Sequence, residues 1–412
     1  MNKSAVALAA DSAVTTGLPG REKIFTGANK IFTLSKFHPV GIMINGHVEH
    51  CGIPFEVLIK EYRRQLGRKR YDLIKDYSED FYSWGSRADF VNENAEAITV
   101  IAAALATYSE LVRRARNARA KLTVAVTNQI LAEMEQEVLR FPVYADFQDL
   151  SQRRFNSLHR DKIDAVILSD EYCPIPVPKT SMSTFRHVVY IAIIHEFPSA
   201  FETGLIISGF GEKELFPSLE EFFFDGVLCG KVRRRLAKSI DIERSKETVF
   251  VSAFAQEDAT KAFLYGVDDA HLTYIFRYLP EILRGYTNEI LDQHTSYDAA
   301  TKRTIVRMLR TSISNVLSDL RETINEFSYR NFFEPVQSVL RNAPKDELAA
   351  VAEAFINITS LKRKVSSERE TVAGPVDVAV ISRGDGFVWI KRKHYFPADL
   401  NHQFMYNYFH VQ

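Results

Sequence analysis

The amino-acid sequence predicts an α+β protein, because its strand-forming and helix-forming segments occupy separate parts of the chain. Short apolar runs bounded by turn residues, typical of strands, gather at 4–46, 164–230 and 376–391. Helical periodicity runs without glycine or proline over 87–140 and returns over 257–340. Hairpin signals outnumber strand–helix–strand units and no glycine-rich phosphate loop follows a strand, which disfavours a doubly wound parallel sheet.

Length and charge restrict the kind of protein. At 412 residues the chain exceeds one ordinary domain, so we expect two or three structural units. Its 52 basic residues balance its 52 acidic ones, which argues against nucleic acid as a partner. The basic and aromatic run 391–396 could bind RNA, but at the end of a hairpin it fits an edge strand protected by charge.

The cysteines and the apolar runs predict a cytoplasmic protein. Cys51, Cys173 and Cys229 are odd in number and far apart, which favours a reducing compartment over a disulfide framework. The start of the chain lacks the apolar core of a signal peptide, because Asp11 interrupts its apolar run. No run reaches the roughly 18 apolar residues that span a membrane, so we expect no membrane partner.

The first predicted elements are strands, and they end or begin at residues that could act in catalysis. An apolar run that starts at Ala5 stops abruptly at Asp11. After a turn-rich loop, the strand-like run 28–34 contains Lys30, and a third run spans Val40–Gly46. Because Asp11 and Lys30 stand at neighbouring strand ends, we expect them to form a charged pair beside a cleft rather than in the core.

A helix is predicted over 54–66, where apolar residues recur at steps of three and four. Pro54 suits its first turn. The basic run 63–70 could form a nucleic-acid patch, but a solvated helix end is the stronger interpretation, since cations are favoured at a helix C-terminus. The buried face is expected to comprise Phe55, Leu58, Ile59, Tyr62 and Leu66.

Two long helical stretches interrupt the strand-forming segments. The stretch 71–160 contains a long part rich in Ala, Leu, Glu and Arg, which are good helix formers. The stretch 256–345 has the same periodicity, with Pro280 as a candidate kink. We interpret both as helical insertions.

Strands are expected to return between the two insertions. The run 164–169 predicts a short strand, and 188–195 with 203–209 predicts a hairpin. Asp225 and Gly226 form a turn signal after the next apolar run.

The end of the chain predicts a helix followed by a hairpin. The segment 346–363 has helical character and ends in basic residues. The alternating runs 376–381 and 387–391 flank the turn 384–386, as in a β-hairpin.

Three short motifs stand in the first strands: Ala-Ala-Asp-Ser at 9–12, Asn-Lys-Ile-Phe at 29–32, and a strand that ends in Gly46. Together with the C-terminal helix and hairpin, they resemble a proteasome β subunit of the bacterial type. That family belongs to the N-terminal-nucleophile (Ntn) hydrolases. The resemblance implies a four-layer αββα sandwich, which this chain would extend by two large helical insertions.

The resemblance also implies a catalytic site. Asp11 matches the conserved Asp of the family, Lys30 its catalytic Lys, and Gly46 the glycine beside the substrate. Glu370 takes the place of an Asp near the amino terminus if Gly374 matches the glycine of that loop. In this family Lys30 would lower the proton affinity of the nucleophile, and Gly46 would offer a backbone N–H to the oxyanion.

The sequence departs from the family at two places. Ala373 stands where the family has a Ser, so one hydrogen bond to the amino terminus is lost. The family nucleophile, usually Thr, begins a strand ahead of the Ala-Ala-Asp strand, which needs about five to six residues and a turn. Met1, Asn2 and Lys3 precede that strand here, and neither Met1 nor Asn2 can attack a carbonyl. We therefore expect no peptidase turnover from the chain as written.

Two functions remain from the sequence. The first is a peptidase or amidase of the Ntn type, acting on a peptide or amide substrate as a homo-oligomer, with a nucleophile absent from this chain as written. The second is a non-catalytic relative that acts as a structural or protein-interaction module. No cofactor or metal is expected, because 47–51 offers imidazoles, a carboxylate and a thiol at a spacing that is not standard for zinc.

The expected organisation divides the chain into five segments. They are 1–70 as the first part of the Ntn sandwich, 71–160 as a helical insertion, 161–255 as the middle of the sandwich, 256–345 as the second insertion, and 346–412 as the C-terminal helix and hairpin.

Overall fold

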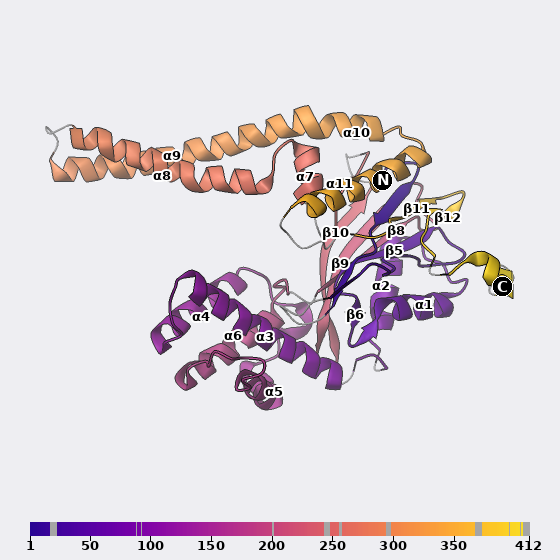
Figure 1. Cartoon of the computed structure of the whole chain (residues 1–412), viewed down its shortest axis with the longest axis horizontal. Coiled ribbons are helices and arrows are strands. Elements are labelled where there is room, and N and C mark those ends of the chain that lie inside the picture. The colour runs from indigo at the N-terminus through magenta and orange to yellow at the C-terminus, as the bar shows by residue number, and fades with distance from the viewer. Residues whose placement is uncertain are drawn as a thin grey trace. The chain divides into compact units, whose positions relative to one another are not determined.

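The structure is a computed structural model, and it bears out an α+β chain with antiparallel sheets (Figure 1). The chain divides into two compact units. The first unit comprises 1–28, 246–380 and 390–412, and the second comprises 29–245 and 381–389. The structure describes residues 1–412 except 17–22, 88, 92, 200–201, 243–247, 255–257, 294–297, 367–372, 395, 404 and 407–412.

A three-stranded sheet begins in the first unit, in the order β1-β11-β12. Its strands are β1 (Val6–Ala10), β11 (Asp377–Ser382) and β12 (Gly386–Lys391), so the predicted C-terminal hairpin is confirmed. Helix α11 (Lys345–Val365) packs on β1, which also confirms the predicted helix. Apolar side chains from these elements form one core, which includes Ala5, Val249, Leu340, Leu348, Val376, Val378 and Val380.

The remaining elements of the first unit are mostly helical. The ribbon β2 (Val14–Thr16) and β3 (Lys23–Phe25) is antiparallel. The second predicted helical stretch is confirmed, and α8 continues through Pro280. It contains α7 (Asp258–Tyr265), α8 (Asp269–Gln293), α9 (Ala299–Ser328), a π-helical segment (Tyr329–Phe333) and α10 (Glu334–Leu340).

The second unit is built on a five-stranded antiparallel sheet in the order β10-β9-β8-β5-β4. Helices α1 (Phe55–Leu66) and α2 (Ile74–Gly85) share an apolar core with this sheet, and α1 buries the five predicted residues. A small ribbon joins β6 (Glu49–His50) to β7 (Ile53–Pro54). The sheet strands are β4 (Ile31–Thr33), β5 (Val40–Gly46), β8 (Thr203–Gly209), β9 (Ser218–Leu228) and β10 (Lys231–Asp241).

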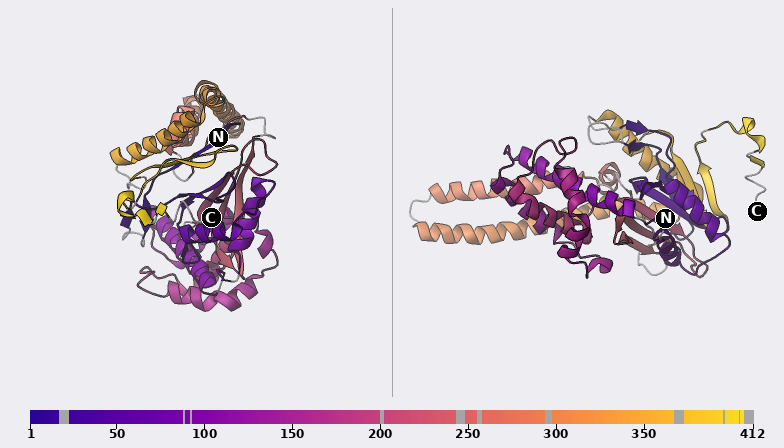
Figure 2. Two further views of the ribbon diagram at one scale, coloured as in Figure 1. Left: turned by 90° about the vertical axis from the view of Figure 1, so that its right-hand side faces the viewer. Right: turned by 90° about the horizontal axis from the view of Figure 1, so that it is seen from below.

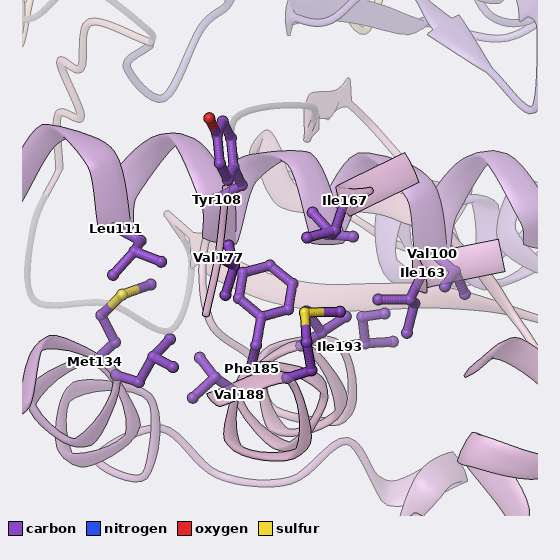
Figure 3. Packing of buried hydrophobic residues seen from close by; sticks show 14 of the residues in the cluster. Val100, Tyr108, Leu111, Met134, Ile163, Ile167, Val177, Phe185, Val188 and Ile193 are labelled. Atoms are coloured by element: carbon purple, nitrogen blue, oxygen red, sulfur yellow. The ribbon is translucent and has the colours of Figure 1, made fainter. Parts of the chain in front are cut away.

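The second unit also holds a group of four packed helices (Figures 1 and 2). They are α3 (Glu93–Asn117), α4 (Val124–Val138), α5 (Gln152–Ile167) and α6 (Met182–Ile194). Figure 3 shows how Tyr108, Leu111, Met134, Phe185 and Val188 from three of these helices meet in the core. In length and composition α3 could cross a membrane, but here its apolar residues contribute to this core.

Two predicted strands are wrong, because residues 164–169 and 188–195 are largely helical. Residues 164–167 end α5, and residues 188–194 end α6. Most of the β-branched residues at the end of α6 are buried in the helical core, and a helix buried on most sides shows the continuous apolar run that a buried strand also has. The strand over 203–209 is confirmed, but its neighbours are β5 and β9.

The predicted turn at Asp225-Gly226 is also wrong, because both residues lie inside β9. The chain turns at Cys229 and Gly230 instead, which have φ of 50° and 73°. Gly226 is needed for a close approach of α3, since a Cβ there would lie 2.3 Å from the hydroxyl oxygen of Thr99.

Candidate functional site

The Asp11 carboxylate forms a hydrogen-bonded corner in the first unit. Asp11 follows β1 and is almost fully buried. Its Oδ2 accepts hydrogen bonds from the backbone N–H groups of Ala13, at 2.9 Å, and Ala373, at 3.2 Å. A buried carboxylate needs such donors, and these two attach the end of β1 to the segment just before β11.

The neighbouring residue Ser12 strengthens the same corner. Its backbone N–H donates to the carbonyl of Ala373 at 3.2 Å, and its hydroxyl donates to the carbonyl of Pro375 at 2.5 Å. Its carbonyl accepts from the N–H of Ala28 at 3.0 Å. Ala373 and Pro375, in the described part of the loop expected beside the catalytic centre, therefore lie against Asp11 and Ser12.

Gly374 is required for this loop to approach so closely. Its φ of +82° lies in the left-handed region that favours glycine. A Cβ at this position would lie 2.9 Å from the Cβ of Thr26 and 3.5 Å from that of Ser12. The backbone geometry and the close packing at position 374 thus explain why a glycine stands there in this chain.

Lys30 and Gly46 occupy one end of two neighbouring strands in the second unit. Lys30 directly precedes β4, and its carbonyl accepts a hydrogen bond of 2.8 Å from Ile44 of β5. Gly46 ends β5 two residues later. Strand pairing therefore places the backbones of Lys30 and Gly46 at the same edge of the five-stranded sheet.

The backbone at Gly46 leaves no room for a side chain. Its φ is +76°, and a Cβ would lie 2.6 Å from the carbonyl oxygen of Glu202. That same carbonyl accepts a hydrogen bond of 3.1 Å from His47, while the Thr203 hydroxyl donates to the His47 carbonyl at 2.6 Å. This end of β5 is fixed on β8 by both backbone and side-chain bonds.

Two ion pairs between a carboxylate and a guanidinium group lie near this strand end. Glu202 lies 3.0 Å from Arg235, and burial raises the pKa of the Glu202 carboxyl although Arg235 opposes the rise. Asp225 lies 2.7 Å from Arg233, and both side chains are buried. Both arginines belong to β10, whereas Asp225 belongs to β9 and Glu202 directly precedes β8.

Arg233 has a structural role that sequence reasoning missed. Its guanidinium donates to the carbonyl of Ile193 at 2.8 Å and to that of Asp225 at 2.6 Å. It therefore satisfies the C-terminal end of α6, where backbone carbonyls lack partners within the helix. The run of arginines at 233–235 beside alternating apolar residues is the signal that could have located it.

The four predicted site residues fall in different parts of the chain. Asp11 belongs to the first unit, whereas Lys30 and Gly46 belong to the second. Glu370 lies outside the described residues. The structure brings Asp11 to Ala373, and it pairs the backbone of Lys30 with that of Ile44, two residues before Gly46. The catalytic role of all four residues stays a prediction.

Residues Met1 and Asn2 are built into the first unit. The Met1 amino group donates to the carbonyl of Phe250 at 2.6 Å, and burial lowers the pKa of this amine to about 5. The amide of Asn2 donates to the carbonyls of Leu340 and Ala343, each at 3.0 Å. Its Oδ1 accepts from two further backbone N–H groups, those of Ser4 and Ala5.

Among the residues that the structure describes, the thiols of Cys51 and Cys173 are not activated. No group of three or more metal-ligating side chains occurs among the residues that the structure describes. His50 lies 3.4 Å from the sulfur of Cys51, but burial raises the pKa of that thiol to about 12. Burial likewise raises the pKa of Cys173 to about 11, so neither thiol is a ready nucleophile.

Comparisons with known proteins add no relative to this geometry. No family model, no curated protein and no solved structure matches the chain.

Proposed function

We propose that this protein is a proteasome-like Ntn hydrolase relative, a peptidase or amidase that acts in the cytoplasm. Its sheets would form the two inner layers of a four-layer αββα sandwich. The observation that carries the proposal is the hydrogen bond between Asp11 and Ala373. The resemblance requires the Asp that ends the Ala-Ala-Asp strand to lie against the loop before the C-terminal hairpin, and Asp11 does so.

The arrangement of Lys30 and Gly46 supports the same proposal. In the family, the lysine and the oxyanion glycine stand at one end of adjacent strands. Here the Lys30 carbonyl pairs with Ile44, two residues before Gly46. Lys30 would lower the proton affinity of the nucleophile, and the N–H of Gly46 would stabilise the oxyanion of the tetrahedral intermediate.

The proposed reaction needs a nucleophile that this 412-residue sequence does not supply. The family uses an N-terminal Thr, Ser or Cys whose own amino group acts as base through a water. In the family that residue begins a strand ahead of the Ala-Ala-Asp strand. The substrate would be a peptide or a simple amide, and the protein would act as a homo-oligomer.

A non-catalytic module is the second candidate, and the contacts of Asn2 favour it. This side chain is 1% exposed and has four hydrogen bonds, so it serves the fold rather than chemistry. In this reading the Asp11 corner would be retained because it holds β1 to β11, and the sandwich would act by binding another protein.

Assays of two forms of the protein separate the candidates. One form is the 412-residue chain, and the other is extended upstream to a strand that begins in Thr, Ser or Cys. Both are tested on short fluorogenic peptides and on simple amides. The hydrolase proposal predicts turnover by the extended form alone. No turnover by either form, with unchanged circular dichroism and thermal unfolding, would instead indicate the non-catalytic module.

A further inference from the structure

The first unit carries a pair of long helices that we call the helical arm, formed by α8 and α9 (Figures 1 and 2). The two helices contact each other along the arm. Among the described residues of the arm, Leu291 is the one buried side chain before the last residue of α9. Side chains on the inner faces, such as Leu279 and Leu320, stay partly exposed. Two helices alone therefore leave the apolar surface of the arm incompletely covered.

A stripe of exposed apolar side chains winds around α8, turning by about 40° at each step of four residues. It consists of large residues at steps of four, and Ile282 and Tyr286 at its centre are 65% and 63% exposed. Residues four apart lie on one side of a helix. In an isolated pair of helices such a stripe stays exposed to water. The stripe comprises Tyr274, Tyr278, Ile282, Tyr286 and Ile290.

Helix α9 has a matching exposed shoulder. Val316 and Phe327 are exposed and stand eleven residues apart, which is close to three helical turns. Ile305 precedes Val316 by the same interval. Both helices of the arm thus expose apolar side chains in addition to their inner faces, as the helices of an incomplete four-helix bundle would.

Charge is distributed unevenly along the arm. The first third of α9 carries Lys302, Arg303 and Arg307, with Arg310 just after it, whereas its last third carries Asp319, Glu322 and Glu326 against Arg321. Among the residues that the structure describes, Arg303, Arg307 and Arg310 form no ion pair within the arm. Lys302 and Glu326 are already paired, with Asp292 and Arg330. The remaining charges, Arg303, Arg307 and Arg310 at one end and Asp319 and Glu322 at the other, can meet opposite charges of another chain.

From these observations we propose that the occupant of the apolar stripe is the arm of a second copy of this chain, aligned antiparallel. Antiparallel alignment places the basic third of each α9 beside the acidic third of the other, whereas parallel alignment would bring like charges together. The product is a four-helix bundle with twofold symmetry, in which the same patch is used by both copies.

The size of the arm fits a stable dimer. Helix α8 has 25 residues, which corresponds to about 37 Å at about 1.5 Å per residue. A face two helices wide, about 20 Å, then offers about 700 Å² on each copy. Stable interfaces bury about 800 Å² per partner, so a single arm provides an interface of standard size.

The test of the apolar stripe is the mass of the full chain in solution, measured by analytical ultracentrifugation from 1 to 100 µM. The unchanged protein is expected to be a dimer over most of this range. The double variant Ile282→Glu with Tyr286→Glu should be a monomer, with unchanged circular dichroism. The matched control Leu168→Glu, at a 63% exposed residue of the second unit, should stay dimeric. If the unchanged protein is a monomer at 100 µM, the proposal is overturned. Binding of that monomer to phosphatidylglycerol vesicles would not alter this conclusion.

The test of the antiparallel alignment is a charge exchange on α9. The double variant Arg307→Glu with Arg310→Glu should raise the Kd of the dimer about tenfold at low salt. In this variant, acidic residues of one copy face acidic residues of the other and repel them. Adding Asp319→Arg and Glu322→Arg to the same chain should restore the original Kd. If the fourfold variant dimerises no better than the double one, the copies do not align antiparallel.

Discussion

The carboxylate of Asp11 accepts a hydrogen bond of 3.2 Å from the backbone N–H of Ala373, 362 residues further along the chain. A contact between such distant residues fixes the two ends of the sequence into one unit. It also defines the corner where β1 stops, because the same oxygen accepts from Ala13.

Replacing Asp11 with alanine should destabilise the first unit by about 3 kcal/mol. The substitution leaves two buried N–H donors without an acceptor, and bonds to a charged acceptor contribute about 1.5–3 kcal/mol each. Urea unfolding followed by circular dichroism measures the loss. The exposed Asp149→Ala is the control and should change stability by less than about 0.5 kcal/mol. Equal stability of the two variants would show that the corner does not hold in solution.

Replacing Gly374 with alanine should cost about 1–3 kcal/mol, because the residue has positive φ and its Cβ would meet Thr26. Thermal unfolding measures the effect as a lower Tm. Gly384→Ala is the matched control, since no atom lies within 4 Å of a Cβ built there and its φ is not in the left-handed region. A Gly374 variant as stable as the Gly384 variant would contradict the close packing of this loop.

His50 should make the second unit sensitive to acid. Its ring is buried against Phe55 and Phe224, and burial lowers the pKa of His50 from 6.5 to about 4. Between these two pH values the unfolded chain binds a proton that the folded one does not. Stability from this group is therefore complete above pH 6.5 and falls by about 3 kcal/mol as pH drops to 4.

The measurement for His50 is the free energy of unfolding between pH 7 and 4. His50→Gln should flatten the decline relative to the unchanged protein, whatever it does to stability at pH 7. His38→Gln, at a partly exposed ring, is the matched control. An unchanged slope in His50→Gln would refute the buried neutral imidazole.

The buried pair of Asp225 and Arg233 should be strongly coupled. Arg233→Met leaves a buried carboxylate without its partner and should destabilise the second unit by about 3–5 kcal/mol. Adding Asp225→Leu should recover part of that loss, so the double variant is more stable than additivity predicts. Denaturant titrations of the four proteins give the coupling energy. A coupling near zero would mean that the two side chains act independently.

An exposed pair provides the comparison for this cycle. Arg70 and Glu212 lie 3.0 Å apart with side chains that are 64% and 49% exposed. Arg70→Met should cost less than about 1 kcal/mol, because surface ion pairs are screened by water and salt. The contrast tests burial as the cause of the coupling.

The sequence predicts best where local chemistry and tertiary packing agree. The strand Val40–Gly46 and the helix beginning at Phe55 occur as expected, because glycine, proline and apolar spacing all indicate the same elements. The C-terminal hairpin occurs for the same reason. Such segments need little information from the rest of the chain.

Prediction fails where distant packing decides the outcome. The end of α6 is rich in β-branched residues and resembles a strand, but the helical core buries most of them and stabilises a helix. Asp225-Gly226 resembles a turn, but Arg233 and Thr99 hold it inside β9. The structural role of Arg233 depends on the carbonyl of Ile193, forty residues away, which no local pattern reveals.

The proposed role of Lys30 in an Ntn-type hydrolysis is tested most directly by the turnover number of the extended protein. Lys30→Ala is expected to lower kcat on a fluorogenic peptide by at least about 100-fold, the usual size of a lost proton-transfer contribution. Lys36→Ala, at an exposed lysine of the same unit, should retain full kcat. Full turnover by the Lys30→Ala protein would contradict the account.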